Sequence, residues 1–396
     1  MTFNCLACGG RLGDILFSIS DLPLVDSFCK TIKEALAVEC FTVELRQCDK
    51  CLTVQIASPP DTSNIYRNYI YESASSPDLL DHFSSYSETI SDIAPCSSTK
   101  ILEIGANDGM LLGKLAAAGF TSILGIDPSP QTAKINIKGV EIINEFFNEA
   151  SVSNLELNSF GVIIANNCFS HIPDLSNILE LCSKLIVDSG TIVIEVQSCL
   201  DLVQGVVFDY IYHEHIYYHT ATSFQRLAAL SGLEIYHIEH VSTKGGSYRF
   251  LLGHASHHPI DRSVSYWIFR EVLAGIHSNT AWELMTNYLA NIKTILQRCI
   301  HDRNCSLVGY GASATGTVLM RYMDIESTVN SIVDDNSKRQ GLFAPGTAIP
   351  VKAPSILSGE DMCLILAWRH SKYIVPKLVE LSIPYIIPLP SIKING

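Results

Sequence analysis

The chain of 396 residues has little positive charge and lacks any long apolar run. Its 27 lysines and arginines stand against 40 aspartates and glutamates, which gives a formal net charge of −13. A general nucleic-acid binder normally carries a basic patch, so this balance argues against that class. No apolar stretch reaches the roughly 18 residues that a membrane-spanning helix needs. We therefore expect neither a nucleic-acid partner nor a membrane anchor.

The sequence also lacks the marks of a secreted protein. Its first residues, Met-Thr-Phe-Asn-Cys, show no basic start followed by an apolar segment, so no signal peptide is predicted. The 13 cysteines are odd in number, and most stand singly in apolar segments, as do Cys168, Cys182 and Cys363. This usage suits a reducing compartment better than a disulfide framework. The expectation is a cytoplasmic protein, either a monomer or a small homo-oligomer.

Four cysteines depart from this scattered pattern. Cys5 and Cys8 form one CxxC pair, and Cys48 and Cys51 form another. Each pair presents two thiolates from a tight turn, and two such turns close a tetrahedral S₄ site, so the spacing predicts a structural Zn²⁺. A redox dithiol and free thiols are the alternatives, whereas a catalytic zinc would need an open position. The 39 residues between the pairs must fold back, and a hairpin around Thr42–Leu45 is predicted.

The middle of the chain alternates apolar strand patterns with helical ones. This alternation predicts an α/β fold with a doubly wound parallel sheet. A helix from Ser223, ended by Gly232, leads to a hairpin that would complete a seven-stranded sheet of the methyltransferase kind. The strands are expected at 100–105, 122–126, 140–143, 160–165 and 190–196, with the hairpin at 233–241 and 248–254.

A glycine turn follows the first of these strands. Its pattern is Glu103-x-Gly105-x-x-x-Gly109, with Asn107 where a dinucleotide fingerprint has its second glycine, and this form is common in S-adenosylmethionine enzymes. Asp127, 22 residues after Gly105, ends the second strand, where an acid can hold both ribose hydroxyls; a helix cap is the alternative. Asn166 ends the fourth strand, where it either contacts a ligand or caps the strand. The predicted cofactor-binding residues are Glu103, Gly105, Asn107, Gly109, Asp127, Asn166 and Phe146.

A second glycine turn lies near the C-terminus. After helical residues 262–300, a strand leads into Gly309-Tyr-Gly311, and acids follow at Asp334, some 23 residues after Gly311. Taken alone, this spacing favours a nicotinamide cofactor, although GxGxxxxG is a weaker signal than GxGxxG. The alternatives are therefore an NAD(P)-dependent oxidoreductase or a domain that only packs. The predicted domains are 1–75, binding zinc; 76–256, binding S-adenosylmethionine; and 257–396, a second Rossmann-like domain.

The stretch 210–218, Tyr-Ile-Tyr-His-Glu-His-Ile-Tyr-Tyr, carries the densest cluster of reactive groups. Such a cluster can take a proton, orient the base and stabilise an oxyanion. It follows the fifth strand, so we expect it on the same rim of the sheet as Asp127 and His171. His213 and His215 would face one side of an extended stretch, and an HxH pair is also a metal signature, so metal binding stays open.

These motifs together resemble one family of enzymes. The paired CxxC head, Glu-Ile-Gly-Ala-Asn-Asp-Gly (103–109), Tyr-His-Glu-His-Ile-Tyr-Tyr (212–218) and Lys-Gly-Gly-Ser-Tyr-Arg (244–249) occur in the order found in the sugar C-methyltransferases. That family acts on nucleotide-linked 4-keto-6-deoxyhexoses, and 341–350 and 367–369 also match its pattern. One departure is Lys244, where the family usually has histidine.

The resemblance implies that the methyl group of S-adenosylmethionine moves to carbon 3 of a TDP- or GDP-linked keto sugar. It also implies that the C-terminal domain helps to hold the nucleotide. His215 would be the base, Glu214 would orient nearby groups, Tyr212 would donate to the sugar oxygen, and His171 and Tyr71 would complete the wall. A zinc-headed binding protein without activity is a third hypothesis. The predicted substrate-binding residues are Lys244, Gly245, Gly246, Ser247, Arg249, Gly311 and Asn336.

Overall fold

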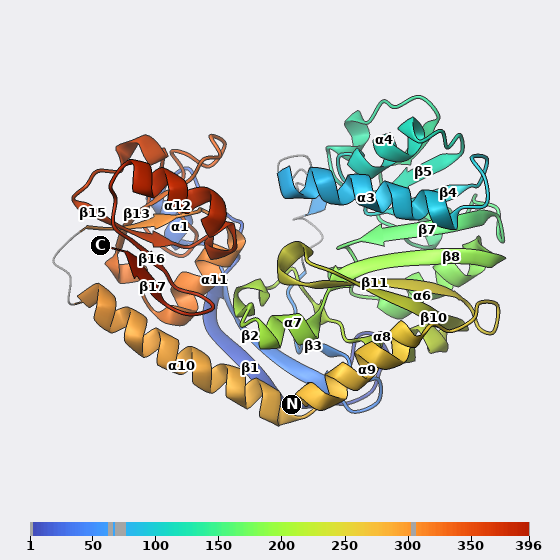
Figure 1. Cartoon of the computed structure of the whole chain (residues 1–396), viewed down its shortest axis with the longest axis horizontal. Coiled ribbons are helices and arrows are strands. Elements are labelled where there is room, and N and C mark those ends of the chain that lie inside the picture. Colours follow the sequence, from blue (N-terminus) through green and yellow to red (C-terminus); the bar gives the residue numbers. More distant parts are fainter. Residues whose placement is uncertain (1–2, 62–65, 68–76, 302–305, 396) are drawn as a thin grey trace.

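The computed structural model describes residues 3–61, 66–67, 77–301 and 306–395. Three β-sheets organise these residues, as Figure 1 shows. A four-stranded sheet lies between a seven-stranded sheet and a six-stranded sheet, and long helices run below them.

The four-stranded sheet is antiparallel and has the order β1-β2-β3-β9. The predicted hairpin around Thr42–Leu45 is wrong, because those residues lie inside β2 and bury Val43 and Leu45. The chain reverses instead through residues 24–39, where Thr31 and Glu34 form a capping box that starts α1. The elements are β1 (Leu12–Pro23), α1 (Ile32–Leu36), β2 (Cys40–Cys48), β3 (Val54–Ile56) and β9 (Tyr217–Tyr218).

The seven-stranded sheet confirms the predicted α/β methyltransferase-type fold. Its order is β10-β11-β8-β7-β4-β5-β6, in which β4 to β8 are parallel and β10 and β11 form the expected antiparallel hairpin. Its strands are β4 (Ile101–Ile104), β5 (Ile123–Ile126), β6 (Val140–Ile143), β7 (Phe160–Asn166), β8 (Ile186–Gln197), β10 (Leu233–Val241) and β11 (Ser247–His254). Its helices are α3 (Pro77–Ile93), α4 (Met110–Ala117), α5 (Glu149–Val152), α6 (Leu175–Leu185), α7 (Cys199–Gln204) and α8 (Ala221–Leu230).

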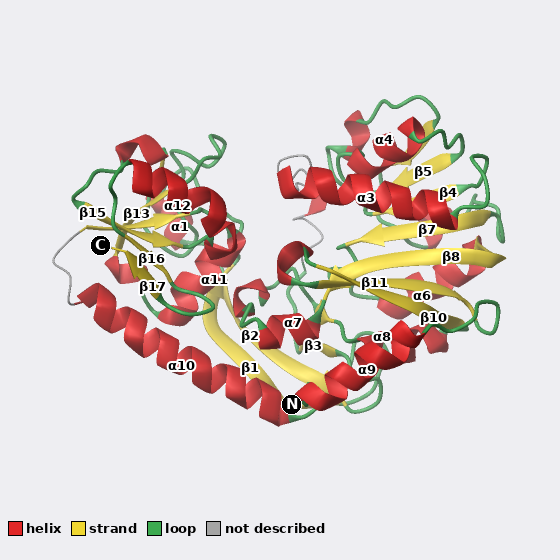
Figure 2. Cartoon of the chain, in the orientation of Figure 1, coloured by secondary structure: helices red, strands yellow, loops and turns green. Residues whose placement is uncertain are grey.

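Helices cover both faces of this sheet (Figure 2). One apolar core joins α3 and α4 to one face, around Tyr86 and Leu112. A second core joins α6 and α8 to the other face, around Leu179, Phe224 and Phe250. Because the helices bury both faces, ligand access is left to the edge where the parallel strands end.

The six-stranded sheet has the order β14-β13-β12-β15-β16-β17, with β17 antiparallel to the rest. This is the strand order of a Rossmann-type sheet, as predicted for the C-terminal domain. Its elements are β12 (Ser306–Tyr310), α11 (Ala314–Met323), β13 (Val329–Val333), β14 (Val351–Lys352), β15 (Asp361–Ile365), α12 (Ser371–Glu380), β16 (Tyr385–Ile387) and β17 (Lys393–Asn395). The helices α9 (Arg262–Ala274) and α10 (Asn279–His301) lead into it.

A continuous apolar core connects the three parts of the molecule. It includes Leu22 of β1, Phe208, Trp282 of α10, Leu319 of α11 and Leu364 of β15, all fully buried. In Figure 1, α10 runs along the lower edge of the molecule, from below the four-stranded sheet up to the six-stranded sheet. The segment around Phe208, which precedes the candidate catalytic stretch, is therefore packed where the three parts meet.

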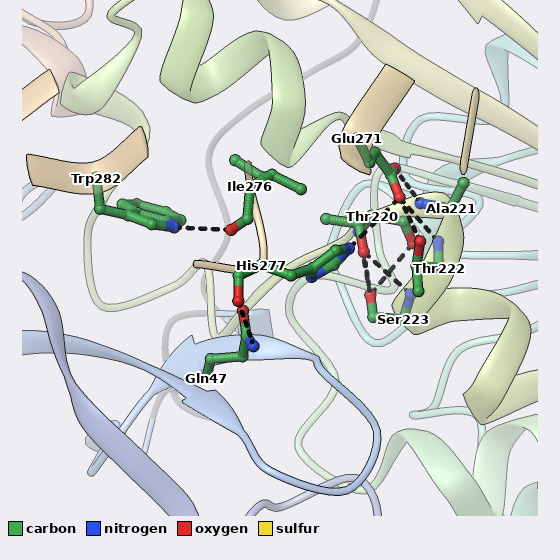
Figure 3. A network of polar contacts seen from close by, with 9 residues as sticks. All are labelled: Gln47, Thr220, Ala221, Thr222, Ser223, Glu271, Ile276, His277 and Trp282. Carbon is green, nitrogen blue, oxygen red and sulfur yellow. Dashed lines mark hydrogen bonds and ion pairs between the residues drawn. The ribbon is translucent and has the colours of Figure 1, made fainter. Parts of the chain in front are cut away.

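A buried carboxylate fixes the start of α8 (Figure 3). Glu271 of α9 accepts from the N–H groups of Ala221 and Thr222, at 2.5 and 3.0 Å, and lies 3.6 Å from His277. Gln47 of β2 in turn donates to the backbone carbonyl of His277 at 3.3 Å. A negative charge at a helix N-terminus is stabilising. This contact holds the chain just after the 210–218 stretch against both α9 and the N-terminal sheet.

Candidate active site

The four cysteines of the two CxxC pairs come together beside the N-terminal sheet. Their sulfur atoms all lie within 4.8 Å of one another, with 3.7 Å between Cys5 and Cys51 and 3.5 Å between Cys8 and Cys48. Four sulfurs at 2.3 Å from one zinc ion are about 3.8 Å apart, so the arrangement fits a tetrahedral Zn²⁺. Among the described residues, these four form the one group of at least three His, Cys, Asp or Glu side chains spaced for a metal ion.

A cavity of about 750 Å³ lies beyond the carboxyl ends of β4, β5 and β7. Six of the seven predicted cofactor residues line it: Glu103, Gly105, Asn107, Asp127, Phe146 and Asn166. Gly109 is instead the N-cap of α4, with φ of 76°, and a Cβ there would lie 2.7 Å from Ile135. Gly105 has φ of 78°, and a Cβ there would lie 2.9 Å from Cys168. The turn needs glycine at both positions, because each has a left-handed φ and no room for a Cβ.

Polar groups of the cavity wall are ready to bind a ligand. Asp127 accepts from the N–H groups of Asn107 and Ser129, at 3.2 and 2.7 Å, which fixes its carboxylate at the rim. Both amide atoms of Asn166 and one carboxyl oxygen of Glu103 are buried without a hydrogen-bond partner among the described residues. Burial, and then the charge of Asp127, raise the pKa of Glu103 well above its usual range. These groups fit a ligand that brings both hydrogen-bond donors and acceptors, as S-adenosylmethionine does with its hydroxyl, amine and carboxylate groups.

Two histidine rings lie side by side next to this cavity. The ring centroids of His171 and His215 are 4.9 Å apart. His171 Nδ1 lies 2.7 Å from the carbonyl of Glu214, and His215 Nδ1 lies 2.7 Å from the carbonyl of Tyr210. Because a carbonyl can only accept, each Nδ1 carries the proton and each Nε2 keeps a lone pair.

Both histidines are neutral at pH 7. Burial lowers the pKa of His171 to about 4. Burial, and then the proximity of His171, hold the pKa of His215 well below its usual range. His215 lines a small cavity of about 20 Å³ that shares His171, Asn167 and Lys244 with the large one. A neutral imidazole beside the large cavity is in the form that accepts a proton.

The rest of the 210–218 stretch is arranged differently from an extended strand. His215 N–H donates to the carbonyl of Tyr212, so residues 212–215 form a turn. The expectation that His213 and His215 face one side is therefore wrong: His213 packs edge-on against Phe41 at 5.3 Å. Tyr212 packs on His215 at 4.2 Å but lines neither cavity.

Glu214 contributes its backbone to the candidate active site. Its carbonyl accepts from His171 and, at 3.4 Å, from the hydroxyl of Tyr66. Its side chain is buried on another side, where burial and then the charge of Asp26 raise its pKa to about 7. Tyr71, predicted in the pocket wall, lies outside the described residues.

The turn at 244–249 brings one predicted substrate residue to the site. Lys244, with φ of 54°, lines both cavities, and burial lowers the pKa of its ammonium. Gly246, with φ of 119°, packs on Asp201, where a Cβ would lie 2.5 Å from the carboxyl carbon. Gly245 faces Val207.

Ser247 and Arg249 point into the protein rather than the cavities. The hydroxyl of Ser247 donates to the carbonyl of Thr243 at 3.1 Å. Arg249 is 2% exposed, pairs with Glu195 at 2.9 Å and covers the ring of Tyr86 at 4.1 Å. Burial works to raise the pKa of Glu195, but His82 and Arg249 beside it hold that pKa below its usual range. Arg249 therefore holds β11 and β8 together within the fold.

The second glycine turn lies apart from both cavities. Gly311 has φ of 107°, and a Cβ there would lie 2.5 Å from Ala367. Asp334 accepts from the N–H groups of Ala312, at 2.7 Å, and Asn336, at 2.7 Å. Neither Gly311 nor Asn336 lines either cavity, so the described structure does not bring them to the histidine pair.

Sequence reasoning missed an ion pair beside the histidines. Asp209 is fully buried and accepts from Arg369 at 2.7 and 2.9 Å and from the indole of Trp368 at 2.9 Å. The sequence did offer one signal for this ion pair: Asp209 directly precedes an aromatic stretch, and a carboxylate buried among aromatic residues needs a charged or hydrogen-bonding partner.

The chain is an α/β protein with a methyltransferase-type sheet, a glycine turn and a cofactor-sized cavity. Residues 78–238 match a family model described as "Methyltransferase domain", and residues 242–390 match one described as "C-methyltransferase C-terminal domain". The chain is an S-adenosylmethionine-dependent C-methyltransferase. Its second glycine turn belongs to this C-terminal domain, so the oxidoreductase alternative is not needed to explain it. Within the part of the chain that the structure describes, no helix has the length and apolar character to cross a membrane.

A curated relative spans the whole chain. It is C-methyltransferase NovU of Streptomyces niveus, 24% identical over 99% of this chain and 96% of its own length. Among solved structures, PH0226 protein of Pyrococcus horikoshii OT3 is 16% identical and covers 48% of this chain and 98% of its own, with a TM-score of 0.40. The CcbJ methyltransferase of Streptomyces caelestis is 13% identical and covers 48% of this chain and 100% of its own, with a TM-score of 0.38. Structural likeness at this level carries no functional information.

Proposed function

We propose that the protein transfers a methyl group to carbon 3 of a nucleotide-linked 4-keto-6-deoxyhexose, with His215 as the base. The observation that carries this proposal is the neutral His215–His171 pair beside the cofactor cavity, each ring with its Nδ1 proton held by a carbonyl. A hydrogen next to a ketone is acidic enough for such a base, and a methyl transfer to carbon needs that hydrogen removed. The sugar substrate is supported by the resemblance of the sequence motifs.

The protein's own groups account for the proton transfer. His215 Nε2 takes the proton from carbon 3, and the electron pair of the C–H bond moves into an enolate whose negative charge lies on the oxygen at carbon 4. Lys244, which lines both cavities, would stabilise that oxyanion through its ammonium group. When bound, S-adenosylmethionine supplies the electrophilic methyl group that the enolate carbon takes. Asp127, Asn166 and Glu103, which line the cavity, would hold that cofactor.

The Cys5–Cys51 cluster has a structural role in this proposal. A zinc ion bound by four thiolates has no open position for a substrate. The four cysteines belong to a segment that is too small to build a large core alone, so the metal would stabilise its fold. The zinc thus supports the N-terminal sheet to which β9 belongs.

Isotope exchange tests the role of His215. Wild-type protein is incubated in D₂O with S-adenosylhomocysteine and a panel of TDP- and GDP-linked 4-keto-6-deoxyhexoses, and mass spectrometry follows deuterium uptake at carbon 3. With S-adenosylmethionine, the same sugars gain one methyl group. We expect His215→Asn to lose both reactions while binding S-adenosylhomocysteine normally. His257→Asn, at an exposed position, serves as the control. Exchange that persists in His215→Asn would mean that another group is the base.

A further inference from the structure

The C-terminal domain reaches the histidine pair through Arg369. Its guanidinium donates to both carboxylate oxygens of Asp209, at 2.7 and 2.9 Å. It also covers the ring of Tyr210 at 4.4 Å. Asp209 is fully buried, and its remaining described partner is the indole N–H of Trp368 at 2.9 Å. A buried carboxylate that loses its cation is left uncompensated, so Arg369 fixes where residues 209 and 210 lie.

Tyr210 contacts His215 in two ways, so the position of Tyr210 affects the position of the His215 ring. The carbonyl of Tyr210 accepts the Nδ1 proton of His215 at 2.7 Å. The two rings are also parallel, at an interplanar angle of 6° with centroids 5.6 Å apart. The Tyr210 ring thus has contacts with Arg369 and with His215. A shift of Tyr210 would move the base and would release its Nδ1 proton to exchange between the two ring nitrogens.

Arg369 lies just after β15, next to the glycine turn at Gly311. Residues 368–370 form a short 3-10 helix just after β15, and Ala367 contacts Gly311 closely enough that a Cβ on that glycine would clash. A Cβ on Gly245 would lie 3.9 Å from the side chain of Arg369, so this residue also approaches the 244–246 turn. Arg369 is therefore a direct contact between the rim of the C-terminal sheet and the catalytic stretch.

We propose that Arg369 is a positioning residue for the catalytic base: through Asp209 and Tyr210 it fixes the orientation and tautomer of His215. This inference rests on the proposed role of His215 as the base. Arginine suits the task because its planar guanidinium can pair with a carboxylate and cover an aromatic ring at the same time, which an ammonium does less well. The base is thereby competent only when the C-terminal domain is docked on the 209–215 stretch.

The kinetic test compares Arg369→Gln and Arg369→Lys with a matched control, Arg321→Gln. Arg321 is a half-buried arginine of the same domain, and its ion-pair partner is Glu326, at 3.2 Å, rather than Asp209. We expect Arg369→Gln to lower deuterium exchange at carbon 3 and kcat by about 10²-fold, as a misplaced catalytic group does, with the Kd for S-adenosylhomocysteine unchanged. Arg369→Lys should lose less, because it keeps the charge beside Asp209. The control should behave as the wild type.

The second readout follows His215 itself and needs no sugar substrate. In protein labelled with ¹⁵N-histidine and saturated with S-adenosylhomocysteine, the signals of His215 are assigned by their absence from His215→Asn. The wild type should show one protonated and one unprotonated ring nitrogen, with well-separated shifts. In Arg369→Gln these shifts should move toward each other as the tautomers interchange. If Arg369→Gln does not fold, Arg369→Lys and Trp368→Phe are measured in its place.

The outcomes separate this inference from the proposed function. Wild-type exchange together with a wild-type His215 tautomer in a folded Arg369 variant would overturn the positioning role. Exchange that persists in His215→Asn would instead overturn the assignment of the base, and the nitrogen shifts would still decide whether Arg369 orients that ring. Equal loss in Arg321→Gln and Arg369→Gln would reduce Arg369 to a general stabilising contact and would also refute the proposal.

Discussion

The carboxyl of Glu214 should make the protein less stable as the pH rises. This side chain is 6% exposed, and burial followed by the charge of Asp26 raises its pKa from 4.5 to about 7. Because the folded-state pKa lies above the unfolded one, the stability that the neutral carboxyl contributes is complete below pH 4.5. It is lost as the pH rises through 7, where the folded protein must ionise a buried group.

The size of the effect follows from the two pKa values. The difference between 4.5 and about 7, at about 1.4 kcal/mol for each tenfold change in proton affinity, corresponds to about 3 kcal/mol. Glu214→Gln keeps the shape of the neutral acid and cannot ionise. The free energy of unfolding of the variant should therefore lie within about 1 kcal/mol of the wild-type value at pH 5 and exceed it by up to about 3 kcal/mol at pH 9.

Thermal unfolding of both proteins between pH 5 and 9 measures this difference. We expect the melting temperature of Glu214→Gln to exceed that of the wild type by roughly 5 °C at pH 9. The buried histidines, such as His213 with a pKa lowered to about 4 by burial, lose their stabilisation as the pH falls from 6.5 to 4. They do so in both proteins, so they cancel in the comparison. Glu39→Gln, which removes an exposed carboxylate of the N-terminal segment, is the control. A Glu214→Gln curve parallel to the wild-type curve would refute the reasoning.

Two further predictions concern the ligand sites. Cys48→Ser should remove most of the bound zinc and lower the melting temperature, because it breaks a buried S₄ site. Elemental analysis measures the zinc, and Cys40→Ser, at an exposed position, is the control. Wild-type zinc content in Cys48→Ser would contradict the assignment of the site. Asp127→Asn should weaken S-adenosylhomocysteine binding by about tenfold, which corresponds to the loss of roughly one charged hydrogen bond. Titration calorimetry measures the affinity, and Asp188→Asn, at an exposed position, is the control. Equal affinities of Asp127→Asn and the wild type would exclude Asp127 as the ribose ligand.

The local parts of the site could be predicted from the sequence. The turn from Glu103 to Gly109 and the acid at Asp127 belong to neighbouring strands, so the period of the pattern and the glycine spacing are sufficient to place them at one rim. The S₄ cluster could be predicted equally well, because each half of it is a turn of four residues. In both cases the chemistry depends on residues close in the sequence or on strands with a fixed order.

The contacts between distant segments could not be predicted in the same way. Arg249 was expected at the substrate, but its partner is Glu195, 54 residues away, on the strand that pairs with its own. Arg369 pairs with Asp209, 160 residues away. His213 turns away from His215 because the chain tightens into a turn, which alternation in the sequence does not reveal. Periodicity gives the face of an element but not the identity of its partner.

The pairing of β9 with β3 has a consequence for the order in which the protein can fold during synthesis. Val54 of β3 pairs with Tyr218 of β9, so the N-terminal sheet takes its last strand from a segment made more than 160 residues later. The ribosome extends a chain by about 5–20 residues each second. The nascent N-terminal segment, which carries the four-cysteine cluster, thus waits on the order of ten seconds with an unpaired edge. The sheet closes only when the tyrosines that follow His215 have emerged, so the N-terminal sheet and the 210–218 stretch become ordered together.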